Sequence, residues 1–327
     1  MKKIFVAVMA MAAFAACSNE EQIAAPQGEA IAFGNAFVDN SVRAGANEVT
    51  DPSYSTNGKG VALEAFNVYG AVNGVNIFNG NTVTKTAGYG EAWTLTGAKQ
   101  YWIAGADYKF VGVVDGNKTV DGVVITKTDL DEAGLPETIN YTVDGATDLL
   151  CNVVTREDVA APYSVVAFNY THLLSKVKFS VKNTTSADAT NYRFKLASAK
   201  LTGVYSSAVY NVEGNSWDTT GSVTREYVLE NLIVNSNSQQ YHSQEVLLLP
   251  GTVGVYVKAD IEASDDNGTT WKKVSEVAKN FATAATLAKG SAYHFIVELG
   301  VGTEIQFTAT EMTDWVDGDG ANDTTLK

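Results

Sequence analysis

Short runs of alternating apolar and polar residues, separated by glycine and asparagine turns, recur along this chain of 327 residues. The clearest run is SKVKFSVKN (175–183), in which Val177, Phe179 and Val181 alternate with lysine and serine. A period of two residues places these three side chains on one face of a β-strand and the polar ones on the other. Because helical periodicity is rare elsewhere, the sequence predicts an all-β protein whose strands cover a core on one side.

Other stretches fit the same scheme. The apolar run EVLLLPGT (245–252) predicts a strand buried on both faces, and the DDNG sequence at Asp265–Gly268 predicts the turn of a hairpin. Many short strands with such turns are typical of β-sandwiches, and the length suits two of them, with a boundary near residues 165–175. Further strands are predicted within residues 61–72, 99–114, 291–299 and 304–312.

The charge and the motifs exclude several classes of function. The net charge is −14, and no basic stripe is present that could neutralise phosphates, so we predict no nucleic-acid partner. The three histidines, His172, His242 and His294, lack metal-ligand spacing, and no hydrolase, zinc-protease or phosphate-loop motif occurs. We therefore predict no enzyme activity, no cofactor and no metal site, and interpret His172 as a hydrogen-bonded structural residue.

The first residues have the pattern of an export signal. Residues 1–16 combine two lysines, an apolar run and small residues directly before Cys17, which is typical of a lipoprotein leader. We predict that Cys17 is acylated and anchors the precursor to a membrane; the alternative is secretion without a lipid. The second cysteine, Cys151, is flanked by apolar residues and is predicted to be buried rather than reactive.

A predicted strand, Ile31–Val38, lies between two polar linkers, residues 18–30 and 39–60. The second linker contains Arg43, one of four arginines in the chain. The alternation of the strand suits a groove that receives every second side chain. It places Ile31, Phe33 and Phe37 on one side and the smaller Ala32, Gly34, Ala36 and Val38 on the other.

The order of several motifs carries a resemblance to a known family. The most specific are THLLSKVKFSV (171–181), LLLPGT (247–252) and IQFTATEMTDW (305–315), which follow the leader and the Ile31–Val38 strand. Over essentially its whole length the chain resembles the Bacteroidales fimbrillins, the subunits of type V pili. The SNEEQ sequence after Cys17 is similar to the surface-display signal of Bacteroidetes lipoproteins.

The resemblance implies two transthyretin-like β-sandwich domains in tandem and a fimbrium at the cell surface that supports adhesion. It also implies a precursor held by a lipid anchor in the outer membrane and cut between Arg43 and Ala44 by an arginine-specific protease. The implied divisions are a signal peptide (1–17), a propeptide (18–43) with the removable strand 31–38, an N-terminal sandwich (44–168) and a C-terminal sandwich (169–327).

The implied mechanism is strand exchange between pilin subunits. Loss of the strand that carries Ile31, Phe33 and Phe37 would leave apolar pockets and unpaired backbone groups for a donated strand to fill. The family's donor is a C-terminal segment, but residues 316–327 are mostly polar. Either the donor is EIQFTATEM (304–312), or this subunit sits at the tip or the anchor of the pilus. The donor residues would then be Ile305, Phe307 and Ala309.

Two alternatives remain. In the first, Ile31–Val38 is a permanent strand and Arg43 an ordinary solvated residue. In the second, the protein is a monomeric surface lipoprotein that binds glycans or host proteins through exposed aromatic residues. Tyr101, Trp102 and Trp217 are the candidates for that surface, although such residues more often pack in a core.

Overall fold

The computed structural model confirms the all-β prediction for the residues that it describes. In the part of the chain that the structure describes, every regular element is a β-strand. No helix in that part has the length and apolar character needed to cross a membrane. The described residues are 28–34, 36–38, 49–50, 61–85, 93–115, 125–183, 193–220, 224–228, 232–234, 241–251, 256–280, 287–299 and 306–312.

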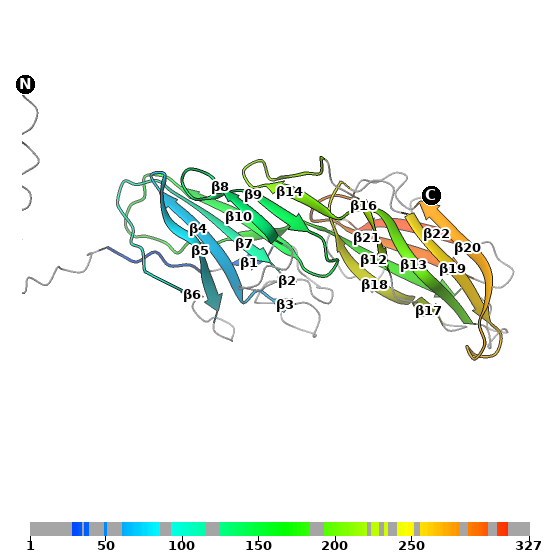
Figure 1. Cartoon of the computed structure of the whole chain (residues 1–327). Helices are drawn as coiled ribbons and strands as arrows, with labels where there is room; N and C mark the ends of the chain where they lie inside the picture. Colours follow the sequence, from blue (N-terminus) through cyan, green and yellow to red (C-terminus); the bar gives the residue numbers. More distant parts are fainter. Residues whose placement is uncertain are drawn as a thin grey trace, which may run out of the picture.

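Two of the sheets are built mostly from the first half of the chain and lie toward one end of an elongated molecule (Figure 1). The seven-stranded sheet has the order β1 (Phe37–Val38), β11 (Asn169–His172), β10 (Leu149–Arg156), β7 (Tyr108–Asp115), β4 (Ala65–Val72), β5 (Val75–Lys85) and β6 (Trp93–Leu95). The four-stranded sheet has the order β15 (Ser216–Asp218), β14 (Ser207–Asn211), β9 (Pro136–Thr142) and β8 (Ile125–Leu130).

Two further sheets lie toward the other end (Figure 1). One has the order β18 (Tyr241–Leu248), β12 (Ser175–Asn183), β21 (Ala292–Leu299) and β22 (Gln306–Met312). The other has the order β16 (Thr224–Val228), β13 (Arg193–Tyr205), β19 (Tyr256–Ser264) and β20 (Lys272–Asn280), with β17 (Leu232–Val234) also paired to β13. A short parallel pair joins β2 (Val49–Thr50) and β3 (Val61–Ala62).

The middle of the seven-stranded sheet is buried on both faces. Along β7, Tyr108, Phe110 and Val114 belong to one buried cluster, whereas Val111 and Val113 belong to another. This is the period of two expected of a strand, with both sides apolar because both sides are covered. The first cluster, here called the aromatic core, consists of Ile31, Phe33, Ala36, Leu63, Phe66, Val68, Phe78, Val83, Trp102, Ala106, Tyr108, Phe110, Val114, Leu150, Val166, Phe168 and Tyr170.

The second cluster, here called the central core, extends from the other face of this sheet into the second half of the molecule. It contains Val113 of β7, Ile139 of β9, Tyr210 of β14 and Val177 of β12. Hydrogen bonds also cross the predicted boundary, since β14 pairs with β9 from beyond it. The boundary itself stays a prediction.

Two glycines in the middle of strands make room for the aromatic core. A Cβ atom on Gly112 of β7 would lie 2.3 Å from the Tyr170 hydroxyl, and one on Gly70 of β4 would lie 2.8 Å from the Phe78 ring. Both distances are below any real contact of a carbon atom. The glycines therefore allow large aromatic side chains from other strands of the sheet to approach the backbone of β4 and β7 closely.

Three local predictions can be compared with the structure. The hairpin is confirmed, because β19 and β20 are antiparallel around Asp265–Gly268. The run Val246–Leu249 is buried throughout, as predicted. Lys176 was expected to face water but is only 4% exposed. Its register partners, Leu247 and Ala292, are themselves buried, so this end of the sheet is covered on both faces.

We expect Gly112→Ala to lower the free energy of unfolding by about 1–3 kcal/mol, because the added methyl overpacks the aromatic core. Urea denaturation of the full chain would measure this. Gly34→Ala is the matched control, since its Cβ would meet Val165 at an ordinary 3.5 Å. Equal stability of the two variants would contradict the packing argument.

Burial raises the pKa of the Cys151 thiol from 9.0 to about 12, with the positive charge of Lys289 opposing that rise. A raised thiol pKa means that almost no thiolate is present near neutral pH, and the thiolate is the reactive form. We expect a Cys17→Ser chain to resist a thiol-reactive disulfide reagent at about pH 8 and to react fully once unfolded. Rapid labelling of the folded chain would contradict this.

Candidate functional site

The N-terminal segment, residues 28–38, lies beside residues 100–102 along one of its sides (Figure 1, blue). The Ile31 amide donates to the Gln100 carbonyl at 2.8 Å, and the Trp102 amide donates to the Glu29 carbonyl at 3.0 Å. Between these two bonds, Ala30 and Tyr101 form an antiparallel bridge. The segment therefore supplies both a donor and an acceptor to this neighbour.

The other side of the N-terminal segment pairs in parallel with residues 166–170. The Val166 amide donates to the Ala32 carbonyl at 2.8 Å, and the Gly34 amide donates to the Val166 carbonyl at 3.0 Å. Pairing continues in parallel where β1 meets β11. Residues 29–31 thus bond to one neighbour, and residues 32–34 and 37–38 bond to the other, so removal of the segment would leave unpaired backbone groups on both neighbours. We call the space that it fills the slot.

Phe33 anchors the segment in the slot. Its side chain is 4% exposed and lies among four phenylalanine rings, three of which come from β4, β5 and β7. These four rings are here called the phenylalanine box. The ring centroids lie 5.5 Å (Phe78), 6.1 Å (Phe110), 6.3 Å (Phe66) and 6.3 Å (Phe168) from that of Phe33.

The geometry of the box is that of favourable aromatic pairs. Phe33 meets Phe66, Phe78 and Phe110 edge to face and stacks on Phe168. Such pairs contribute about 0.5–1.5 kcal/mol each beyond the burial of area. The box therefore fits a planar ring better than an aliphatic side chain of similar volume.

The side-chain alternation of the N-terminal segment changes after Phe33. Ile31 and Phe33 are buried and Ala32 is exposed, as predicted, but Ala36 was predicted on the opposite face and is only 2% exposed. Phe33 pairs with Val166 and Phe37 with Asn169. The segment thus advances four residues (33 to 37) while its partner advances three (166 to 169). One extra residue in a strand reverses which side chains face inward.

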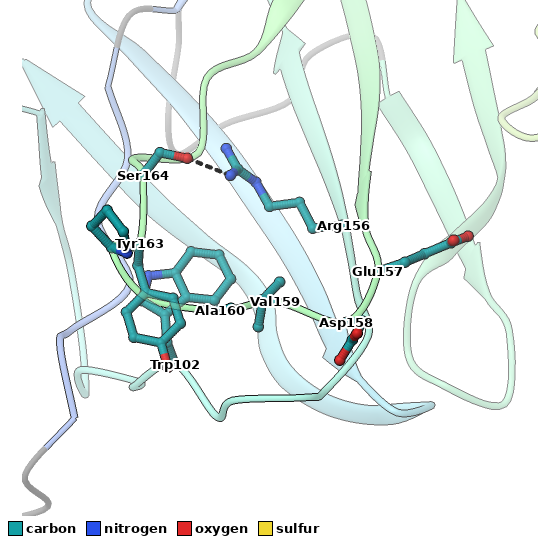
Figure 2. Close-up of a pocket in the computed structure, with 9 residues that line it drawn as sticks. Trp102, Arg156, Glu157, Asp158, Val159, Ala160, Tyr163 and Ser164 are labelled. Carbon is teal, nitrogen blue, oxygen red and sulfur yellow. Dashed lines mark hydrogen bonds between the residues drawn. The ribbon is translucent and has the colours of Figure 1, made fainter.

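One wall of the slot is a loop that Arg156 holds in place. Arg156 donates one hydrogen bond to the Ser164 hydroxyl (Figure 2). It donates another, of 2.8 Å, to the Val165 carbonyl. Its guanidinium carbon also lies 5.8 Å from the centre of the Trp102 ring, the distance of a cation–π contact. Arg156 thereby fixes the residues directly before Val166, the backbone partner of the segment.

A hollow of about 340 Å³ opens beside this wall (Figure 2). It is lined by Arg156, by Trp102 and by the loop 157–164. Tyr163 stacks on Trp102 with a centroid distance of 5.6 Å, so the tyrosine covers one face of the buried indole. Trp102 consequently acts as part of the aromatic core rather than as an exposed platform.

Two buried polar side chains, those of His172 and Asp148, are paired with each other. His172 Nδ1 lies 2.7 Å from Asp148 Oδ2, and both side chains are inaccessible, which confirms the interpretation of His172 as a structural group. Burial raises the pKa of the Tyr170 hydroxyl well above its ordinary value. Among the residues that the structure describes, no cluster of His, Cys, Asp and Glu has the arrangement of a metal site.

The remaining predicted site residues lie wholly or partly outside the part of the chain that the structure describes. Cys17, Arg43, Ala44 and Ile305 lie outside the described residues. Phe37 lies in β1, and Phe307 and Ala309 lie in β22 opposite Val297 and Phe295, but their side chains also lie outside the description. Their roles stay predictions.

The sequence reasoning missed the walls of the slot and the box that receives Phe33. The signal for the box was present in the chain: Phe66, Gly70, Phe110 and Gly112 have the spacing that puts them on one face of two strands. The pairing of the N-terminal segment with residues 100–102 and 166–170 had no local signal, because neither partner is close to it in sequence.

A family model described as Fimbrillin-like matches residues 39–315. The match includes both partners of the N-terminal segment and begins directly after the end of β1. No curated protein matches the chain.

Two solved structures share the fold. A fimbrial protein from Bacteroides vulgatus has a TM-score of 0.59 and 14% identity, over 88% of this chain and 99% of its own. A candidate cell adhesion protein from Bacteroides uniformis has a TM-score of 0.52 and 14% identity, over 89% of this chain and 100% of its own. At this identity the likeness concerns the fold alone.

We expect Phe33→Ala to destabilise the N-terminal segment by about 3–5 kcal/mol, the usual loss when a buried phenylalanine is truncated. Hydrogen exchange should then become faster at the amides of Trp102 and Val166, which bond to Glu29 and Ala32. Ala32→Ser, at an exposed position of the same segment, is the control and should leave both amides protected. Unchanged protection in Phe33→Ala would show that the box does not hold the segment.

Proposed function

Because the chain belongs to the fimbrillin-like family, we propose that it is a structural subunit of a surface pilus that polymerises by strand exchange. Proteins of this family are structural and non-enzymatic. The observation that carries the proposal is the position of the N-terminal segment. It is bonded along both sides, its Phe33 is enclosed by four aromatic rings, and it lies at the start of the chain.

In this proposal the N-terminal segment holds the precursor in an inactive state. Arg43 follows the last residue of β1, Val38, by five positions (38 to 43) and lies in a polar stretch of sequence, the kind of linker in which proteolytic cleavage is common. Cleavage between Arg43 and Ala44 by an arginine-specific protease would convert the segment from part of the chain into a separate peptide. Its return to the slot would then compete with a strand from another subunit.

A donated strand would restore the main-chain hydrogen bonds and the apolar burial that are lost when the N-terminal segment leaves the slot. An empty slot exposes backbone groups on two edges and the apolar surface beneath Ile31 and Phe33. Burial of such side chains is worth about 1.5–3 kcal/mol each on transfer scales, so an empty slot is unfavourable in water. Strand addition supplies main-chain hydrogen bonds and fills the same pockets. The proposed donor carries Ile305, Phe307 and Ala309.

The other parts of the proposal concern location and architecture. Acylation of Cys17 would tether the precursor to the outer membrane until cleavage releases the mature chain, which fits the cell-surface location that the family suggests. The two ends of the molecule would correspond to transthyretin-like sandwiches in tandem, divided near residue 168 as 44–168 and 169–327. Other pilin subunits are the partners.

For the alternative, a monomeric surface lipoprotein that binds glycans or host proteins, two of the three candidate aromatic residues lie in packing contacts. Trp102 is 6% exposed, and the Trp217 indole nitrogen donates to the Leu173 carbonyl at 2.7 Å. Trp217 also packs against Tyr141 and Tyr210. Both tryptophans therefore act in packing.

We expect the purified precursor to assemble only after treatment with an arginine-specific protease. Arg43→Ala and Arg43→Lys should both abolish assembly, since neither offers the protease an arginine in this linker. Ser41→Ala, two positions away, is the control and should assemble as the unchanged chain does. Light scattering and electron microscopy measure assembly, and mass spectrometry identifies the cut. Fibres from treated Arg43→Ala precursor would remove Arg43 from the mechanism.

A further inference from the structure

The positive charge of Arg156 has no carboxylate partner in the part of the chain that the structure describes. Its contacts there are the Ser164 hydroxyl, the Val165 carbonyl and the Trp102 ring, and none of these groups is charged. The side chain of the next residue, Glu157, extends away from the guanidinium (Figure 2). Because Arg156 also lines the hollow of about 340 Å³, the hollow contains a cation whose charge a bound anion could balance.

The guanidinium of Arg156 retains N–H groups that could bind such an anion. An arginine has five N–H groups, and the loop accepts one bond from Nη1 and one from Nη2. The Nε atom is buried and has no hydrogen-bond partner among the described residues. A buried donor without a partner is unfavourable, so an acceptor from a ligand would be stabilising there. Carboxylates are such acceptors, since their two oxygens match the fork of a guanidinium.

The size and the apolar part of the hollow fit a small ring. A volume of about 340 Å³ lies near the lower end of the range for ligand pockets, so the hollow suits one compact unit rather than a long chain. Tyr163, which is half-buried, contributes an aromatic ring, and Val159, Ala160 and Pro162 contribute apolar surface. These side chains can pack against the C–H groups of a saturated ring.

Two exposed carboxylates at the rim restrict the charge of the ligand. Glu157 and Asp158 both line the hollow. A carboxylate accepts hydrogen bonds from hydroxyl groups, but it repels a second negative charge that comes close. The rim therefore favours a ligand with a single carboxylate and several hydroxyl groups, and it disfavours polyanions.

The loop 157–164 is held at both ends, so the hollow exists before a ligand arrives. At its start, the Asp158 amide donates to Asp107 Oδ1 at 2.8 Å. At its end, Arg156 donates to the Ser164 hydroxyl. A preformed site loses less conformational freedom when it binds a ligand.

We propose that the hollow is a binding site for an acidic monosaccharide unit, that is, a sugar ring that carries one carboxylate. The carboxylate lies on Arg156, the apolar face of the ring lies against Tyr163, and hydroxyl groups face Asp158. This site requires neither cleavage of the precursor nor strand exchange, so it is independent of the assembly proposed above. It would give a surface subunit its own contact with acidic glycans.

The test uses the full chain, with glucuronic acid, glucose and acetate as the probes. Glucuronic acid and glucose share the ring and differ in the carboxylate, whereas acetate has the carboxylate without the ring. We expect calorimetry to give glucuronic acid a dissociation constant at least about 10-fold lower than that of either other probe, because only this probe uses both parts of the site. Chemical-shift changes at the amides of residues 157–164 would locate the binding.

Arg156→Gln should weaken the binding of glucuronic acid by about 10-fold or more, and Arg156→Lys by less, since lysine keeps the charge but loses the fork. Arg193→Gln is the matched control and should bind within about twofold, because Arg193 bonds to Asn267 outside the hollow. Hydrogen exchange at the Val166 amide shows whether the wall of the slot stays closed in Arg156→Gln. If it opens, Tyr163→Ala decides, since it leaves the bonds of Arg156 in place and should weaken binding by about 5-fold.

Each part of the inference can fail separately. Binding of glucose as tight as that of glucuronic acid would overturn the role of Arg156, and equal binding of acetate would show an adventitious anion only. Shift changes outside residues 157–164 alone, or unchanged binding in both Arg156→Gln and Tyr163→Ala, would overturn the site. No binding of any probe at about 50 mM would overturn the whole inference. Assembly after protease treatment is a separate measurement, and none of these results would change it.

Discussion

The packing of the Phe33 ring against Phe66, Phe78, Phe110 and Phe168 determines how the first half of the molecule is closed. Strands β4, β5 and β7 supply three of these rings, and without Phe33 the aromatic core would be open to water at its centre. The hydrogen bonds on both sides of the N-terminal segment set its direction and register. The ring supplies, together with Ile31 and Ala36, the apolar burial that holds the segment there.

The two faces of the seven-stranded sheet belong to separate cores. Along β7 and β10, residues such as Val111, Val113 and Leu149 pack in the central core together with β9 and β14. An exchange of the N-terminal segment would thus alter one face while the opposite face keeps the strands aligned. Gly70 and Gly112 leave space for aromatic rings on the face of the sheet that belongs to the aromatic core.

Local sequence patterns predicted the features that are determined by residues close together in the sequence. The period of two predicted the strands, including those of the hairpin around Asp265–Gly268. The continuous apolar run predicted that Val246–Leu249 is buried. The inward direction of Ile31 and Phe33 also followed from alternation. Features that depend on distant partners could not be predicted in this way. The burial of Lys176 depends on its neighbours across two other strands, and the inward turn of Ala36 depends on a register set by residues 166–169.

The bonding of the segment along both sides has a mechanical consequence for any strand that takes its place. A force that pulls such a strand along its own axis loads the bonds to residues 100–102 and to residues 166–170 together, in shear. The bonds cannot then break one after another from an end, as they would in an edge strand peeled sideways. A fibre joined through this slot would resist tension through the bonds to both neighbours at once, and the enclosed aromatic ring would oppose sliding of the strand.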